Sequence, residues 1–205
     1  MAPEPRVVPR FAAEPPQEVA PYGRWAETLA QELRGAIDLE FGEIAWYPDR
    51  TWHGRTYVPA TARTADGAEV FGVVSFRAGG TESGSEPTGL RATADSTDDT
   101  AEHNPGWTLD LCDEVIGGWR GEHGQVATMT LVWGTPLVRG GAVATAELAD
   151  LTVDQCTLSA DGRFTLLAPD DYGGDVLDIK LFNAAGRELA RESLYDEDED
   201  GESEG

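Results

Sequence analysis

The stretch that decides the fold is residues 55–77, which read RTYVPATARTADGAEVFGVVSFR. Apolar and polar side chains alternate on both sides of the pair Asp66-Gly67, and this dipeptide is typical of a two-residue turn between antiparallel strands. The pattern predicts that a strand over Arg55–Thr64 pairs with a strand over Ala68–Arg77. We expect one face of this hairpin to be buried and to carry Val58, Ala60, Ala62, Val70, Val74 and Phe76.

Short alternating stretches continue to the end of the chain, and no helix-length crossover separates them. We therefore expect antiparallel pairing throughout and a mainly β, sandwich-like fold. In one stretch, the pair Gly117-Gly118 predicts a bend after the strand. The expected strands, besides the hairpin, are Glu43–Tyr47, Leu90–Asp95, Trp107–Arg120, Val126–Gly134, Val143–Asp150, Thr152–Leu158, Arg163–Leu167, Val176–Asn183 and Glu188–Leu194.

One amphipathic helix is expected near the start of the chain. Trp25, Leu29, Leu33 and Ile37 recur at every fourth residue, which is the spacing of a single apolar helix face. Proline before this segment and glycine after it favour a helix within residues 22–42.

These patterns divide the chain into five parts. Residues 1–21 are rich in proline and predict an extended, disordered arm ahead of the helix. The strands fall into a β-rich part, 43–121, with a flexible loop at 78–89, and a sandwich-like part, 122–195. Residues 196–205 form an acidic tail that we expect to be disordered. The sequence leaves open whether the two β parts are sheets of one sandwich or two small domains.

The stretch at 168–195, APDDYGGDVLDIKLFNAAGRELARESLY, resembles the last three strands of an immunoglobulin-like domain. In such domains a tyrosine at the corner before the penultimate strand bonds back to the backbone, and Tyr172 occupies about that place. The cysteine–tryptophan–cysteine spacing of true immunoglobulin domains is absent, so the resemblance concerns architecture and assigns no family.

The charge of the chain limits its partners. Fifteen basic residues stand against 38 acidic ones, for a net charge of −23. Nucleic-acid binding needs Lys and Arg to neutralise phosphates, and anionic membranes repel acidic surfaces, so we expect neither class of partner. A basic protein partner suits the charge better. The first twenty residues contain no unbroken apolar stretch, which predicts a cytoplasmic protein with reduced thiols at Cys112 and Cys156.

Two groups of residues are candidate sites. Trp46, Trp52 and His53 flank a polar loop, and they are the exposed aromatic side chains that we expect at a binding surface, for instance against a sugar ring. The acidic segment after residue 94 offers carboxylate ligands for Ca²⁺, which takes six to eight oxygen atoms with loose geometry; its candidate ligands are Asp95, Asp98, Asp99 and Glu102. Its spacing departs from the EF-hand pattern.

The sequence favours a non-catalytic binding or scaffold protein with an acidic surface. No serine-nucleophile motif, phosphate-binding loop or zinc-ligand spacing occurs in the chain. Two alternatives stay open: a hydrolase or carbohydrate-acting enzyme that uses Asp or Glu, and a calcium-dependent structural protein.

Overall fold

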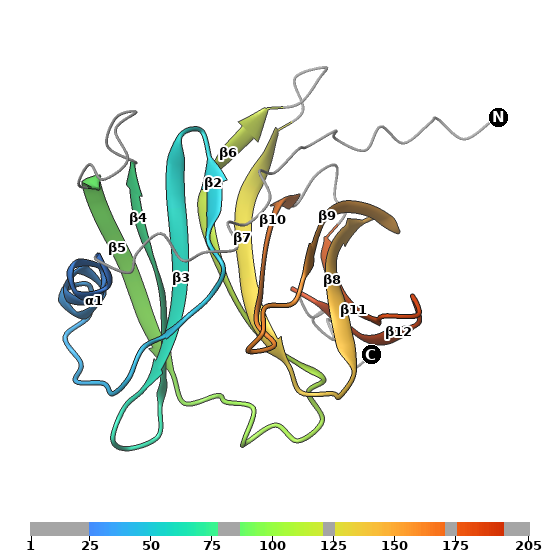
Figure 1. Cartoon of the computed structure of the whole chain (residues 1–205), viewed down its shortest axis with the longest axis horizontal. Coiled ribbons are helices and arrows are strands. Elements are labelled where there is room, and N and C mark those ends of the chain that lie inside the picture. Colours follow the sequence, from blue (N-terminus) through green and yellow to red (C-terminus); the bar gives the residue numbers. More distant parts are fainter. Residues whose placement is uncertain (1–24, 78–86, 121–125, 171–175, 195–205) are drawn as a thin grey trace, which may run out of the picture.

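The computed structural model describes residues 25–77, 87–120, 126–170 and 176–194 (Figure 1). Within these ranges the chain forms one α-helix and strands β1 to β12, and every pairing between strands is antiparallel. The expected mainly β, antiparallel fold is confirmed. The helix among these residues is too short to reach across a bilayer.

The first sheet has the strand order β1-β3-β4-β5, and β2 pairs with the opposite end of β3. The β3–β4 hairpin follows the sequence pattern: Val58 lies opposite Val74, and Ala62 lies opposite Val70. Gly67 at its turn has a φ of 99°, a backbone conformation that glycine adopts without strain. The strands are β1 (Ala45–Trp46), β2 (Arg50–Trp52), β3 (Arg55–Arg63), β4 (Glu69–Arg77) and β5 (Thr88–Thr97).

Helix α1 (Ala26–Gly35) covers the apolar face of this hairpin. Its buried residues Leu29 and Leu33 belong to one core with all six side chains expected on that face. The helix is shorter than the 22–42 segment expected from the sequence. After Gly35 the chain turns back, and the Arg34 guanidinium holds the return by donating to the carbonyl oxygens of Phe41 and Gly42 at 2.8 and 2.9 Å.

The remaining strands form two sheets. The middle sheet has the order β10-β7-β6, and the outer sheet has the order β12-β11-β8-β9. The middle-sheet strands are β6 (Leu109–Arg120), β7 (Val126–Pro136) and β10 (Phe164–Asp170). The outer-sheet strands are β8 (Gly141–Leu148), β9 (Leu151–Thr157), β11 (Leu177–Asn183) and β12 (Glu188–Ser193).

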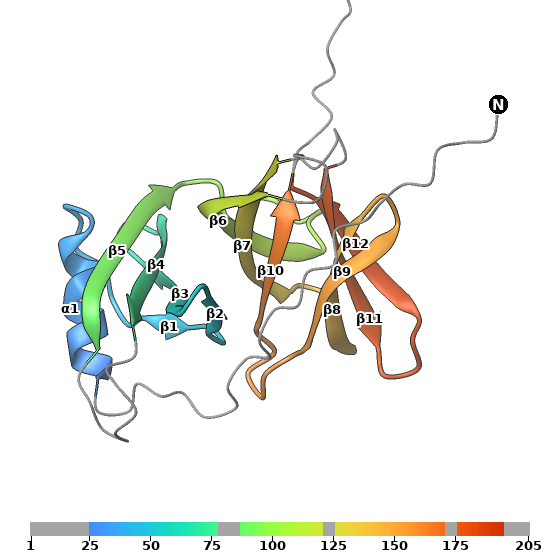
Figure 2. The same ribbon diagram turned by 90° about the horizontal axis from the view of Figure 1, so that it is seen from above.

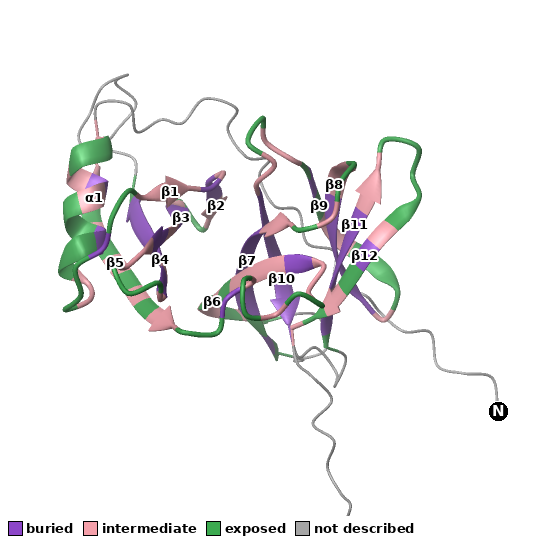
Figure 3. Cartoon of the chain, turned by 90° about the horizontal axis from the view of Figure 1, so that it is seen from below, coloured by how far each residue is buried: buried purple, intermediate pink, exposed green. Residues whose placement is uncertain are grey.

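The molecule is a stack of four layers: α1, the first sheet, the middle sheet and the outer sheet (Figure 2). Three hydrophobic cores lie between successive layers, so β7 and β10 of the middle sheet are buried on both faces. On β7, Leu131 and Trp133 face the first sheet, whereas Val132 between them faces the outer sheet. Every residue of β10 is buried, as Figure 3 shows in purple.

Strand β6 differs from its expectation. The Gly117-Gly118 pair does not end the strand in a bend; β6 runs through it, with a register shift between Val115 and Gly117. Gly117 is required at this point because a Cβ there would lie 2.6 Å from Cζ3 of Trp52. The bulge therefore lets the edge of the middle sheet approach the first sheet closely.

Strand β6 pairs with β7, so the change from the first sheet to the middle sheet falls between residues 97 and 109. The arm at 1–21, the acidic tail at 196–205 and Tyr172 lie outside the described residues, as does most of the 78–89 loop. Both thiols are free: Cys156 is buried, and Cys112 is partly buried between the first and middle sheets.

A buried arginine ties the three sheets together. Arg50 of β2 is 2% exposed. Its Nε donates to the carbonyl oxygen of Thr165 on β10 at 2.9 Å, and its Nη2 lies 2.6 Å from Oδ2 of Asp154 on β9. The same Asp154 oxygen accepts the backbone N–H of Leu167 at 2.8 Å. The Arg50–Asp154 ion pair joins the first and outer sheets, and the hydrogen bonds of both side chains to β10 add the middle sheet.

Candidate functional site

The polar side chains of greatest chemical interest lie on the face of the first sheet that meets the middle sheet. We call this interface the seam; it is made by every second residue of β3, β4 and β5 and by β6 opposite them. Side chains of a strand alternate between its two faces, so the seam face is the one that α1 does not cover. The pairing register places Tyr57 beside Ser75 and Ser75 beside Arg91 on this face.

One end of the seam is basic. Arg55 and Arg77 occupy the neighbouring ends of β3 and β4, because Thr56 pairs with Phe76, and Arg91 follows on β5. Burial raises the pKa of the Tyr57 phenol, and the positive charges of Arg55, Arg77 and Arg91 lower it in part. Three guanidinium groups from three adjacent strands therefore surround one phenol, in a chain where acidic residues far outnumber basic ones.

A cavity of about 180 Å³ opens at this basic end. Its polar lining comes from four strands: Arg55, Tyr57, Ser75, Arg91, Thr93 and Glu114. Nη1 of Arg55 is held by Oγ of Ser75 at 3.0 Å and by the carbonyl oxygen of Gly89 at 2.9 Å. Glu114 reaches in from β6; burial raises its pKa, and a hydrogen bond from Thr93 opposes that shift. Apolar side chains of Val73 and Ile116 complete the wall.

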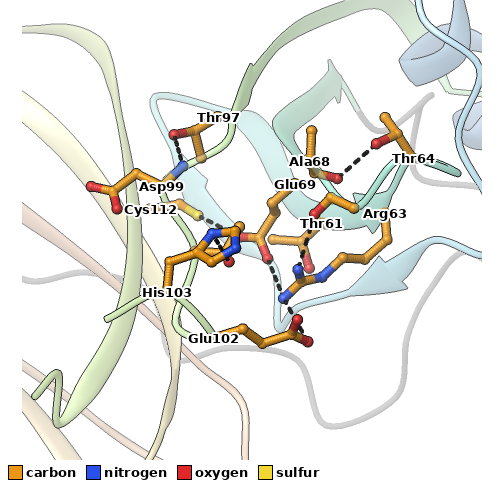
Figure 4. Close-up of polar contacts among 12 residues, drawn as sticks. Thr61, Arg63, Thr64, Ala68, Glu69, Thr97, Asp99, Glu102, His103 and Cys112 are labelled. Atoms are coloured by element: carbon orange, nitrogen blue, oxygen red, sulfur yellow. Dashed lines mark hydrogen bonds and ion pairs between the residues drawn. The ribbon is translucent and has the colours of Figure 1, made fainter. Parts of the chain in front are cut away.

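The opposite end of the seam is acidic (Figure 4). Nη2 of Arg63 lies 3.6 Å from Glu69 and 3.9 Å from Glu102. Burial is the main cause that raises the pKa of Glu69, and the nearby charge of Asp110 raises it further. Burial also raises the pKa of Asp110. Two neighbouring carboxyl groups, Glu69 buried and Asp110 partly buried, therefore hold their protons to higher pH than exposed ones would.

The Cys112 thiol at this end of the seam is held in its neutral, unreactive form. Sγ of Cys112 donates to Oε1 of Glu69 at 3.9 Å. Burial, followed by the charges of Glu69 and Asp110, raises the pKa of Cys112 well above its usual value. Because the thiolate is the reactive form, this environment opposes nucleophilic chemistry. Tyr47 beside it is likewise held neutral, since burial raises its pKa to about 12.

The structure separates the aromatic residues expected at a binding surface. Trp46 pairs with Ala60, so it lies on the α1 side of the first sheet and packs into that core. Trp52 pairs with Arg55 and lies on the seam side, half-buried. His53 stacks on Trp52 with 4.2 Å between ring centroids, at the exposed tip of the β2–β3 turn. Trp52 and His53 meet, but Trp46 does not join them.

The expected calcium ligands are not brought together. Asp95 accepts the backbone N–H of Ser96, and the carboxylate of Asp99 is bound by the Asn104 amide. Glu102 turns toward Arg63, and Asp98 is exposed. Among residues 25–77, 87–120, 126–170 and 176–194, no group of three His, Cys, Asp or Glu side chains is arranged to hold a metal ion.

The arginines of the basic end were not among the site residues predicted from the sequence. A signal was nevertheless present: the hairpin register set by Asp66-Gly67 already places Arg55 and Arg77 side by side. The position of Arg91 depends on the register between β4 and β5. Residues 78–86 connect these two strands, and the length of this connection does not reveal the register from the sequence.

Chemically, the seam has a basic end and an acidic end, separated by the apolar side chains of Val73 and Phe71. No protein-family model matches this chain, and neither a curated protein nor a solved structure shows significant similarity to it.

Proposed function

We propose that this chain is a non-catalytic binding protein whose acidic surface recognises a basic protein partner. The supporting observation is the excess of exposed carboxylates over the few cations, several of which are bound within the chain. Nη1 of Arg163 donates to the Trp46 carbonyl oxygen at 2.9 Å, and Nζ of Lys180 lies 2.5 Å from Oε2 of Glu147, where both side chains are buried. Arg34 and Arg50 are likewise bound to their own chain.

Carboxylates project outward from several elements. The exposed ones include Glu27, Glu32, Asp98, Asp99 and Glu102. Because acidic residues outnumber basic ones so strongly in the chain, the outward charge stays negative even though some carboxylates are buried. Such a field steers a basic partner toward the surface and repels phosphate backbones and anionic lipids.

The fold suits this role. We propose that β6 to β12 form an immunoglobulin-like sandwich, because their first, second and fifth strands share one sheet and the others share the facing sheet. This order differs from the constant-type arrangement in that the fourth strand, β9, joins the outer sheet. Sandwiches of this kind present loops at both ends, where binding residues concentrate.

The experiment compares immobilised basic, neutral and acidic peptides of equal length as probes over a range of salt concentrations. We expect binding to the basic peptide alone, weakening as salt screens the interaction. The variants Asp98→Asn/Asp99→Asn/Glu102→Gln and Glu27→Gln/Glu32→Gln/Glu40→Gln remove equal charge from different places. Each should slow association severalfold, because the steering field is summed over the surface. Equal binding to the basic and neutral peptides would contradict the proposal.

A second candidate function is hydrolysis by paired carboxyl groups, which the acidic end of the seam favours. A carboxyl group with a raised pKa serves as a general acid beside an ionised neighbour. Glu69 and Asp110 are neighbouring carboxyl groups whose pKa values are both raised by burial, so either could supply the acid. Turnover of a panel of nitrophenyl glycosides, lost in Glu69→Gln, would support this candidate. Absence of turnover across the panel would count against it.

A further inference from the structure

We propose that the cavity at the basic end of the seam binds a small carboxylic acid that also carries a hydroxyl or ammonium group. This site is distinct from the acidic surface proposed above and takes the opposite kind of charge. The proposal depends on the arginines, on the shape of the cavity and on the glutamate opposite them.

Within the described parts of the chain, the arginines at the basic end have no carboxylate partner. Like charges on neighbouring strands destabilise a sheet, yet Arg55 and Arg91 line one cavity and Arg77 lies beside Arg55 at the end of β4. In the part of the chain that the structure describes, the ion pairs involve other cations, and these three guanidinium groups contact no carboxylate. A bound anion would relieve this repulsion.

The geometry prepares the site for a carboxylate. Ser75 and the Gly89 carbonyl oxygen fix the Arg55 guanidinium at the cavity wall. A planar guanidinium presents parallel N–H groups that match the two oxygens of a carboxylate. Fixing it in advance lowers the entropy lost when the ligand binds. Arg91, from β5, lines the same cavity and is exposed, so its guanidinium is accessible to a ligand.

The size of the cavity selects a small ligand. Its volume is about 180 Å³. Drug-sized ligands occupy pockets of roughly 300–1,000 Å³. The ligand is therefore an acid of a few carbon atoms, whose apolar part would contact Val73 and Ile116.

The carboxylate of Glu114 determines which class of small anion fits the cavity. It faces the arginines across the cavity and, like Arg55 and Arg91, lines it. A phosphate dianion would be repelled by this carboxylate, whereas a hydroxyl or ammonium group beside the ligand's carboxylate would donate to it. The positive charge of the arginines and the negative charge of Glu114 together therefore favour a hydroxy or amino acid over both phosphate and a simple acid.

The test titrates the whole chain with lactate, alanine, acetate and inorganic phosphate, and follows the arginine side-chain N–H resonances by NMR. We expect lactate or alanine to bind more tightly than acetate, and acetate more tightly than phosphate. Arg91→Gln should weaken the best ligand at least tenfold. Arg187→Gln, which removes the same charge from the exposed β11–β12 turn, should leave its affinity unchanged.

Two further variants complete the test. Glu114→Gln should reduce the preference for lactate or alanine over acetate. Glu82→Gln/Glu86→Gln removes the carboxylates of the 78–86 connection and should retain or strengthen binding. Equal or tighter phosphate binding, no saturable binding of the acids, or an unchanged affinity in Arg91→Gln would overturn the proposal. Binding of the basic peptide by Arg91→Gln is measured in parallel, so that failure of one site is distinguished from failure of the other.

Discussion

At the scale of single residues, the most consequential side chain is Arg50. It is almost fully buried, and its charge is compensated by Asp154 on a strand of the outer sheet. Desolvating such a pair costs about as much free energy as the attraction returns, so the pair by itself adds little stability. Breaking it is a different matter, because the Arg50 guanidinium would stay buried after losing the Asp154 carboxylate.

We therefore expect Asp154→Ala to lower the free energy of unfolding by about 3–5 kcal/mol. Asp161→Ala is the matched control, since Asp161 is 76% exposed and lies 3.9 Å from Arg163; we expect it to cost under about 1 kcal/mol. Guanidinium denaturation measures both. The double variant Arg50→Met/Asp154→Leu should recover most of the loss. Equal effects of the two aspartate variants would contradict this account.

At the scale of elements, the β6 bulge tests how the first and middle sheets fit together. Gly117→Ala would place a methyl group against the Trp52 ring, and the ring would have to move. We expect a loss of about 1–3 kcal/mol, as in other overpacked sites, with a change in tryptophan fluorescence. Gly118→Ala meets nothing within 4 Å and should be neutral or slightly stabilising. Chemical denaturation of the two variants, side by side, decides the matter.

The strands themselves were largely predictable. The β3–β4 hairpin, its register and its buried face follow from Asp66-Gly67 and from period-two alternation, both of which are local signals. Strand β2 was not predicted, because Arg50–Trp52 is too short for a pattern. The bend expected at Gly117-Gly118 was wrong for a non-local reason: glycine there makes room for a tryptophan that lies far away in the sequence.

The candidate site was much less predictable than the strands. Its arginines come from separate strands, and only the pairing of those strands brings them together. The aromatic residues suggested by the sequence fall on two faces of one sheet, because Trp46 and Trp52 belong to different short strands paired with β3. Sequence alternation gives the two faces of each strand, but it does not say which face meets which layer.

At the scale of the whole molecule, buried carboxyl groups control the pH dependence of stability. Burial raises the pKa of Glu69, Asp110 and Glu114 in the folded chain. The folded state then binds more protons than the unfolded state in the interval between the two sets of pKa values. The stability that these groups contribute is full below their unfolded pKa values and is lost as the pH rises through the folded ones.

We therefore expect the urea midpoint to rise when the pH is lowered from 7.5 toward about 5, where weaker self-repulsion of the acidic chain acts in the same direction. The variant Glu69→Gln/Asp110→Asn should flatten this dependence. Glu27→Gln/Glu32→Gln, which removes the same charge from exposed sites, should flatten it less. A midpoint that falls steadily on acidification would contradict the expectation.

The burial of β7 and β10 on both faces also determines where the chain can be cut into two pieces. A cut between β5 and β6 would leave Met129, Leu131 and Trp133 of one piece in water, together with Tyr57 and Val73 of the other. Each piece would expose a row of hydrophobic side chains and would tend to aggregate when expressed alone. The same rows are complementary, so the two pieces, expressed together, are natural halves of a split protein that reassembles along them.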